Sequence, residues 1–552
     1  MDAYDAGFQY WKSMRDALAL AVNNYVDASN ILCGTLMSSL RSGTPQKLLE
    51  RTLAGINLEL PSLEFDQEKL DAASATLGAV RNSCQTAVPV NRLPPDILLN
   101  IFTLSTGKYT RFDRTATFRS EGSHSPSVLA GVCGLWRNIM LESPCLWSTI
   151  YLTICNFRNS EEYNQAALWV ERSAQAPLYI NIEDYQPGSF HLEGIEQVCG
   201  SDLLEVLKFL APLGPRIQAL NVELLVNSEL AVSLVMRLWV DNCSAVPGKT
   251  LQIINGAAPD HVSSVFGPNK TISADQFNRF FPSVSRINLQ YCYIPKFVPF
   301  HEGLVDLCLG YMDPLNRLNQ EDLVRILSAT PRLRIFSLAD CQIQRSDVTP
   351  HPVTLSHLES LSLESHEAPP TSVYVLPLIN TGIQKLDMSL TLGDNSPEFK
   401  NEVRLFFARS RVVRLLVWQG VTARGSIEAI FCPMLHLRTL AIERFDISDD
   451  TLGGGIQGIL QGRAPPPWPA LHVLHFRLNN VDLDCLEAIV RMHPIKKLHM
   501  HDPRIIGAGE MEAGDEEWTK LHVRFGAVED FHIFLEEDYS EMDTWDFSVL
   551  VE

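Results

Sequence analysis

The sequence predicts an α/β fold in which a curved solenoid of parallel strands follows an all-helical N-terminal segment. Two observations support this prediction. An apolar frame of constant spacing recurs through the second half of the chain, whereas the first quarter carries apolar residues at the three- and four-residue steps of amphipathic helices. The 552 residues are enough for several domains or for one elongated repeat array.

The recurring frame is L-x-x-L-x-L-x-x-N/C-x-L, the spacing of leucine-rich repeats. Complete matches are Val284/Ile287/Leu289/Cys292/Ile294, Leu333/Phe336/Leu338/Cys341/Ile343 and Leu471/Leu474/Phe476/Asn479/Val481. Partial copies start at Ile217, Leu251, Leu304, Leu358, Ile383, Val412, Leu437, Ile495 and Val528. One unit cannot bury its own apolar face, so we expect each to contribute a short parallel strand that stacks on its neighbours.

The polar position of the frame predicts a structural role. A small side chain there, such as Cys341 or Asn479, can turn inward and bond backbone groups in the bend after the strand. Those groups would otherwise be buried without partners.

Between Val90 and Ile150 the sequence predicts two short amphipathic helices. Proline and Asp96 favour a helix start near Pro94, and an apolar stripe follows at Leu93, Ile97, Leu98, Ile101 and Phe102. Ser125 and Pro126 open the second helix, whose apolar face comprises Leu129, Val132, Cys133, Trp136, Ile139 and Met140. Leu146 and Trp147 add a further apolar anchor.

At these residues the chain resembles the F-box. The order of parts agrees: Leu93-Pro94-Pro95-Asp96-Ile97-Leu98, Ile101-Phe102, Val132-Cys133-Gly134-Leu135-Trp136-Arg137 and Pro144-Cys145-Leu146-Trp147. An insertion from about Ser105 to Ser125 departs from the usual pattern, and its composition predicts a solvated loop. A later stretch, Glu171 to Leu178, is similar to the F-box families of mushroom-forming fungi. The alternative is an ordinary helical pair within a larger core.

The resemblance implies docking onto a Skp-type adaptor of a cullin-RING ubiquitin ligase. The residues that it assigns to adaptor binding are Leu93, Pro94, Ile97, Leu98, Ile101, Phe102, Leu129, Val132, Cys133, Trp136, Leu146 and Trp147. The predicted function is substrate recognition for that ligase, with an unknown protein substrate on the repeats. The alternative is a leucine-rich-repeat scaffold that binds the adaptor outside any ligase.

We expect five parts: a helical segment (1–88), the F-box (89–150), a linker with a helix and a first strand (151–200), the solenoid (201–535) and an acidic tail (536–552). The tail is predicted to be flexible or to cap the solenoid. In the first part, helices are predicted from Phe8 to about Leu40 and from Leu63 to Cys84, with a break at Ser42 to Pro45. They could form a coiled-coil arm, but heptads are not sustained, so packing onto the F-box is favoured.

Composition excludes several classes of function. The net charge of −20 argues against binding to nucleic acid, which needs cationic side chains on phosphates. The acidic N-terminus lacks the features of a secretory signal, and no apolar run is long enough for a membrane span, so a cytoplasmic or nuclear protein without membrane contact is expected. Twelve cysteines without a C-x-x-C pair indicate free thiols.

Three motifs resemble cofactor-binding or metal-binding sites, but the sequence around each of them does not fit such a site. Gly453 to Gly458 satisfies G-x-G-x-x-G but does not follow a strand directly, and Pro247 removes an N–H that a P-loop ending at Gly248-Lys249-Thr250 would need. His472, His475, His499 and His501 lack the remaining ligands of a zinc site at recognisable spacing. We therefore expect no catalytic residues, no metal and no cofactor.

The predicted target site lies on the concave face of the C-terminal repeats. Side chains alternate along a strand, so residues between the buried positions point away from the core. Among these outward residues, the predicted target-binding ones are Trp418, Glu443, His475, Arg477, His499 and His501. Stacked parallel strands would place His475 beside His499 and Arg477 beside His501, and the crowded imidazoles predict binding that responds to pH between about 5.5 and 7.5. The alternative is a solvated face on which Trp418 packs beside Leu416.

Overall fold

The computed structural model describes residues 2–42, 46–83, 88–106, 125–154, 161–184, 200–224, 229–244, 246–255, 274–292, 300–311, 318–347, 350–365, 371–393, 396–419, 427–447, 466–501, 504–506, 516–526 and 528–534. Two compact units divide the chain. The first comprises Met1–Pro94 with Ala130–Arg137, and the second comprises Pro95–Leu129 with Asn138–Glu552. The acidic tail, the glycines from 453 to 458 and most of the predicted loop near 105–125 lie outside the described residues.

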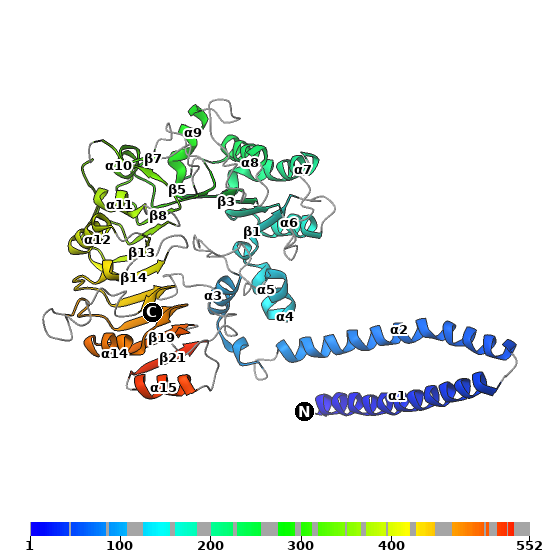
Figure 1. The fold of residues 1–552 in the computed structure, drawn as a ribbon. Helices are drawn as coiled ribbons and strands as arrows, with labels where there is room; N and C mark the ends of the chain where they lie inside the picture. Colours follow the sequence, from blue (N-terminus) through cyan, green and yellow to red (C-terminus); the bar gives the residue numbers. More distant parts are fainter. Residues whose placement is uncertain are drawn as a thin grey trace. The chain divides into compact units, whose positions relative to one another are not determined.

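Two long helices dominate the first unit (Figure 1): α1 (Asp2–Ser42) and α2 (Gln46–Ser83). The helix bounds confirm the predicted break, although α2 starts earlier than its apolar pattern predicts. The apolar stripe of α1 remains in solvent, with Phe8 58% and Trp11 42% exposed. The favoured packing of α1 is therefore not seen among the described residues of this unit, and the coiled-coil alternative stays open.

Short helices lie where the sequence predicts two: α3 (Pro95–Ser105), followed by α4 (Pro126–Val132) and α5 (Gly134–Leu141). Two short 3-10 helices were not predicted, η1 (Pro89–Arg92) and η2 (Pro144–Trp147). Ser125 accepts a hydrogen bond from the backbone N–H of Ser127 at 3.3 Å, as a helix-capping serine does. The single helix predicted after Ser125 is wrong in one respect. It is two helices that break at Cys133, whose carbonyl begins α5 by accepting from the N–H of Arg137 at 2.9 Å.

The second unit contains the predicted solenoid, and the α/β fold class is confirmed. Fourteen strands of its described residues form one sheet in which all pairings are parallel. They are β1 (Thr149–Thr153), β2 (Leu178–Glu183), β3 (Ile217–Leu224), β4 (Lys249–Asn255), β5 (Val284–Gln290), β6 (Asp306–Gly310), β8 (Ile335–Ala339), β11 (Ser360–Glu364), β13 (Leu386–Leu392), β14 (Val412–Gln419), β15 (Thr439–Glu443), β17 (Val473–Arg477), β19 (Lys497–His501) and β21 (Asp530–Phe534).

Every complete or partial copy of the apolar frame supplies one of these strands. The sheet also extends further toward the N-terminus than residue 201, where the solenoid is predicted to start, because β1 and β2 pair in register with each other and β2 pairs with β3. β2 contains the first strand predicted from sequence, whereas β1 was missed. Its residues Ile150 and Leu152 are buried, an alternation that the sequence contains but that is too short to stand out.

Helices run along the outer side of the strand arc (Figure 1), which leaves the opposite face of the sheet concave. They are α6 (Glu161–Arg172), α7 (Gly200–Leu210), η4 (Ala211–Arg216), α8 (Glu229–Asn242), α9 (Ala274–Phe280), η5 (Phe281–Ser283), α10 (Gln320–Ala329), α11 (Ser372–Val375), η7 (Leu376–Leu378), α12 (Pro397–Arg409), η8 (Ile427–Ile430), α14 (Leu483–Met492) and α15 (Glu516–Phe525). Short strands add three small parallel sheets: β7 (Leu318–Asn319) with β9 (Ile343–Gln344), β10 (Val353–Leu355) with β12 (Ile379–Thr381), and β16 (Asp446–Ile447) with β18 (Asn480–Val481) and β20 (Arg504–Ile505).

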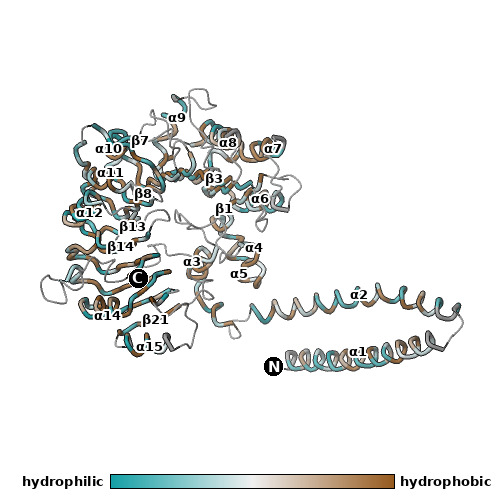
Figure 2. The backbone as a smooth tube through the Cα atoms, viewed as in Figure 1, coloured by the Kyte–Doolittle hydropathy of each residue, from teal (hydrophilic) through white to brown (hydrophobic). Residues whose placement is uncertain are grey.

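The core lies between the sheet and these helices. Figure 2 shows apolar, brown segments in the strands and in the helices beside them. Large side chains that are fully buried there include Trp239, Trp468, Phe336, Phe399, Phe406 and Phe476. Helix starts are fixed locally: the Ser396 hydroxyl accepts from the N–H of Phe399 at 3.2 Å, and the Asp482 carboxylate accepts from the N–H of Cys485 at 3.1 Å.

A residue in the left-handed backbone conformation follows several strands of the sheet. Tyr291, Tyr311, Asp340, Arg444 and Leu478 each follow a strand directly, with φ between 47° and 62°. This conformation is unfavourable for side chains other than glycine. Each of these residues donates its N–H to the carbonyl of the last residue of the next strand, at 2.7 to 3.0 Å, so the bend extends the ladder by one more bond.

The residue at the polar position of the frame forms hydrogen bonds with buried backbone groups of the same bend. The Asn479 side chain is fully buried; its Oδ1 accepts from the N–H of Phe445 at 2.6 Å and its Nδ2 donates to the carbonyl of Ile442 at 2.7 Å. Cys341 is 1% exposed and its thiol points to the carbonyl of Leu309 at 3.4 Å. The predicted inward role of both residues is confirmed.

Replacing Asn479 by alanine is expected to destabilise the chain by about 1 to 3 kcal/mol, because it leaves a buried N–H and a buried carbonyl without partners. Urea unfolding of the full chain measures this loss. Asn480 supplies the matched control, since it is the next residue and lies exposed; Asn480→Ala should change the unfolding midpoint much less. Equal midpoints for the two variants would contradict the role given to Asn479.

Candidate functional site

The concave face of the sheet carries three rows of side chains, because in-register parallel strands bring equivalent positions together. At the C-terminal end, the middle row runs Leu416, Ala441, His475, His499 and His532. The row beside it, nearer the carboxyl ends of the strands, runs Trp418, Glu443, Arg477, His501 and Phe534. We call these ten residues the C-terminal concave face. The predicted pairings of His475 with His499 and of Arg477 with His501 are confirmed.

Ring contacts link the histidines across neighbouring strands. The imidazoles of His475 and His499 meet edge to face with centroids 5.0 Å apart, and His499 meets His532 in the same way at 5.5 Å. His501 stacks on Phe534 at 4.5 Å with the planes 3° apart. The result is a continuous aromatic surface on strands β17, β19 and β21.

Burial divides this surface into two kinds of residue. His475 and His501 are only 4% and 6% exposed to solvent, whereas the Arg477 side chain is 26% exposed. His475 and His501 are therefore covered within the face, and the predicted target contact of the six residues stays a prediction. Rings on adjacent strands contact them: His499 packs against His475, and Phe534 packs against His501.

The charges on this face are few and mostly paired. Arg477 Nη1 lies 3.9 Å from a carboxylate oxygen of Glu443, and Lys497 Nζ lies 3.5 Å from Asp530. Asp530 also contacts His532 Nε2 at 2.8 Å and His499 Nε2 at 3.6 Å. Burial acts to raise the pKa of Asp530, but His499, His532 and Lys497 outweigh it and lower that pKa.

His475 and His501 do not supply the expected response of binding to pH between about 5.5 and 7.5, which stays a prediction for this face. Burial, reinforced by His499, His501 and Lys497, lowers the pKa of His475 to about 3, although Asp530 opposes the shift. Burial together with His499 and Arg477 lowers the pKa of His501 to about 4, and burial likewise lowers the pKa of His499 despite the opposing charge of Asp530. His475 and His501 are therefore neutral throughout that range and act as stacking groups.

Sequence reasoning missed the last strand of the site. His532 and Phe534 occupy the outward positions of the partial frame that starts at Val528, and the alternation used for the other strands would have assigned them. It also missed a carboxyl cluster at the other end of the concave face. Glu223 pairs with Glu183 across β2 and β3, and burial followed by the charges of Glu183 and Asp184 raises the pKa of Glu223 to about 7.

In the first unit, the F-box-like motif keeps several apolar side chains at the surface. Leu93 is 37% exposed, Val132 is 39% exposed, and Pro94 is also exposed. Trp136 is half-buried, and its indole N–H donates to Asn91 Oδ1 at 2.8 Å. Asn91, which is 2% exposed, also donates to the carbonyl of Asn82 at 2.5 Å and thereby ties Trp136 to the end of α2.

In the second unit, the motif residues of α3 point in two directions. Ile97 and Ile101 are 41% and 37% exposed, whereas Leu98 and Phe102 are fully buried. Leu129, Leu146 and Trp147 of this unit are buried as well, and so is Cys133 of the first unit. Trp147 donates to the carbonyl of Met140 at 2.7 Å and lies under the Arg172 guanidinium at 4.3 Å. These buried residues can support the exposed ones, and their part in adaptor binding stays a prediction.

No group of three or more His, Cys, Asp or Glu residues in the part of the chain that the structure describes is placed to hold a metal ion, and the described cysteines are free thiols. None of the described helices combines the length and the apolar character that crossing a membrane requires. What the C-terminal concave face offers is a shaped, largely neutral surface of rings with one accessible arginine.

No protein-family model matches the chain, and no curated protein matches it. The class of protein is therefore defined by the fold: a helical N-terminal segment followed by a repeat solenoid built on one long parallel sheet, as in leucine-rich-repeat proteins.

The buried histidines predict a loss of stability on acidification. The unfolded chain protonates His475 near pH 6.5, whereas the folded chain resists protonation until about pH 3, so stability from this group is complete above the first value and falls below it. At about pH 5 the loss is roughly 2 kcal/mol for this residue alone.

Urea unfolding of the parent and of His475→Gln between pH 8 and pH 5 measures this effect. The variant should lose about 2 kcal/mol less over that range. At pH 8 neither state is protonated at this position, so the difference between the two proteins there reports packing only. Parallel pH profiles would contradict a depressed pKa for His475.

Proposed function

We propose that this chain is the substrate-recognition subunit of a Skp–cullin–F-box ubiquitin ligase. In this proposal the F-box-like segment docks a Skp-type adaptor, and the solenoid holds a target protein. The observation that carries it is the order of F-box motif blocks on short helices, with Leu93, Pro94, Ile97, Ile101 and Val132 left at the surface. Exposed apolar side chains gathered in one short stretch of sequence are typical of a docking segment.

The proposed chemistry of the chain is binding without bond formation. The RING and conjugating-enzyme partners of such a ligase would transfer ubiquitin, and this chain would contribute proximity. A long parallel solenoid suits that role, since stacked strands give an extended face on which residues far apart in sequence act together. On the C-terminal concave face, Trp418 and Arg477 belong to the residue types most enriched at binding hot spots.

A second candidate is a scaffold that binds the adaptor outside any ligase. It makes the same first contact, and the exposed apolar residues favour both candidates equally. Co-purification separates them: a cullin that follows the adaptor onto the full chain supports the ligase subunit, whereas adaptor without cullin supports the scaffold.

Replacing Leu93 and Pro94 together by alanine is expected to weaken adaptor binding at least tenfold. Burial of one large aliphatic side chain at an interface is worth roughly 1.5 to 3 kcal/mol, and a tenfold change needs about 1.4 kcal/mol. Binding of purified adaptor to the full chain by calorimetry measures the effect. Leu168→Ala is the matched control, because this leucine of α6 is exposed to a similar degree, 40%, outside the F-box-like segment. Unchanged affinity in a folded double variant would refute the docking assignment.

For the target, Trp418→Ala and Arg477→Ala are each expected to weaken binding by roughly 2 kcal/mol, about thirtyfold in affinity, if they form the centre of the contact. Affinity for a captured target protein is the measurement. Arg286→Ala provides the control, since Arg286 lies on the concave face of β5, far along the sheet from β17. If all three variants bind as the parent does, the target site lies elsewhere, and Trp418 merely packs beside Leu416.

A further inference from the structure

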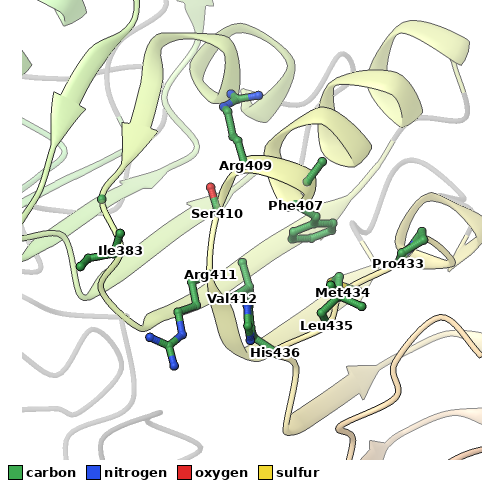
Figure 3. A pocket seen from close by; sticks show the side chains of 12 residues that line it. Ile383, Phe407, Arg409, Ser410, Arg411, Val412, Pro433, Met434, Leu435 and His436 are labelled. Atoms are coloured by element: carbon green, nitrogen blue, oxygen red, sulfur yellow. The ribbon is translucent and has the colours of Figure 1, made fainter.

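A cavity of about 590 Å³ lies at the edge of the solenoid where the chain enters strands β13, β14 and β15. Three segments line it: Gly382 with Ile383 before β13, Phe407 to Val412 between α12 and β14, and Pro433 to His436 before β15. Figure 3 shows these segments around one space, with the Phe407, Met434 and Leu435 side chains near one another in the view and the Arg409 side chain directed away from them. Its volume falls within the range of small-ligand and side-chain pockets.

The apolar part of the cavity has a buried floor and an exposed rim. Phe407, Val412 and Met434 are 4%, 2% and 3% exposed, so they form a fixed surface. Ile383 and Leu435 at the rim are 86% and 67% exposed, which makes them two of the three most exposed large apolar side chains among the described residues of the solenoid. Two such side chains flanking one cavity leave apolar surface that a ligand can bury.

The charged residues of the lining are two arginines. Arg409 and Arg411 line the cavity, His436 adds an imidazole, and none of its twelve lining residues is an aspartate or glutamate. Arg409 is held in place because its guanidinium donates to the carbonyl of Leu376 at 2.6 Å. Arg411 and His436 are exposed. On a chain with a net charge of −20, this concentration of cations is a local exception that complements an anion.

Arg411 occupies a defined place in the repeat frame. It stands immediately before Val412, the first apolar position of its unit, as Arg332 stands before Leu333 in the unit of β8. The two arginines are both exposed and both precede a strand. Arg332 is not among the lining residues of the cavity, so it offers a control that differs only in what surrounds it.

We propose that this cavity binds an acidic peptide segment of a partner protein that carries one large apolar side chain. The apolar side chain would enter between Ile383 and Leu435 onto Phe407 and Met434, and flanking carboxylates would pair with Arg411 and accept a hydrogen bond from the imidazole of His436. A peptide is favoured over a nucleic acid because the rim is apolar and the chain as a whole repels polyphosphates. The proposal concerns the edge of the solenoid and does not depend on adaptor docking.

Fluorescence anisotropy of the full chain with a fluorescein-labelled synthetic peptide, Asp-Glu-Leu-Glu-Asp, tests it. Saturable binding is expected, and the same peptide with serine in place of leucine should bind at least tenfold more weakly. Arg411→Glu should also weaken binding at least tenfold, whereas Arg332→Glu should leave it unchanged. Leu435→Ala is a second variant at an exposed position, and it should weaken binding of the leucine peptide while sparing the weaker binding of the serine peptide.

Three results would overturn the proposal. The first is no saturable binding up to about 1 mM peptide, a concentration that corresponds to a binding free energy of about 4 kcal/mol. The others are equal affinity for the leucine and serine peptides, or an equal loss of affinity in the Arg411→Glu and Arg332→Glu variants. The latter two outcomes would show recognition of charge alone. Thermal unfolding of each variant verifies that it is folded. Adaptor binding, measured on the same variants, reports the proposed ligase function separately, since that function survives if only the peptide fails to bind.

Discussion

Parallel pairing of short strands is the constraint on which the solenoid depends. A single strand with its return segment leaves one row of backbone N–H and carbonyl groups on each side without partners, and buried groups of this kind cost more than most side-chain contacts return. Each unit is therefore stable only between neighbours. The bend after the strand meets the same demand, since the backbone there is buried but no longer in the sheet.

The chain meets that demand with two repeated devices. A left-handed residue such as Leu478 extends the ladder past the strand, and an inward polar group such as Asn479 satisfies the N–H and the carbonyl that the bend exposes. Cys341 does part of the same work with a thiol, a weaker hydrogen-bonding group that is better suited to an apolar surrounding. Because these devices fix the register, they also fix which side chains become neighbours on the concave face.

That register determines which side chains are neighbours on the C-terminal concave face. Histidines that lie 24 and 33 residues apart become ring neighbours, and burial lowers the pKa of both His475 and His499. The accessible features are then Arg477, half-buried Trp418 and the rings of β21. At the edge of the same sheet, the loops before β13 to β15 gather cations and exposed aliphatic side chains, so the solenoid presents two chemically different surfaces.

The sequence by itself determined the fold class, the helical start of the chain and the position of nearly every strand, because the apolar frame states directly which residues must be buried. It also determined the inward role of Asn479, since the spacing places that residue in the bend. The neutral state and burial of His475 and His501, the exposure of α1 and the cavity beside Arg411 were decided only by the tertiary structure. Each depends on distances between residues of different units of the array, and the pattern within one unit carries no information about how deeply its neighbours cover it.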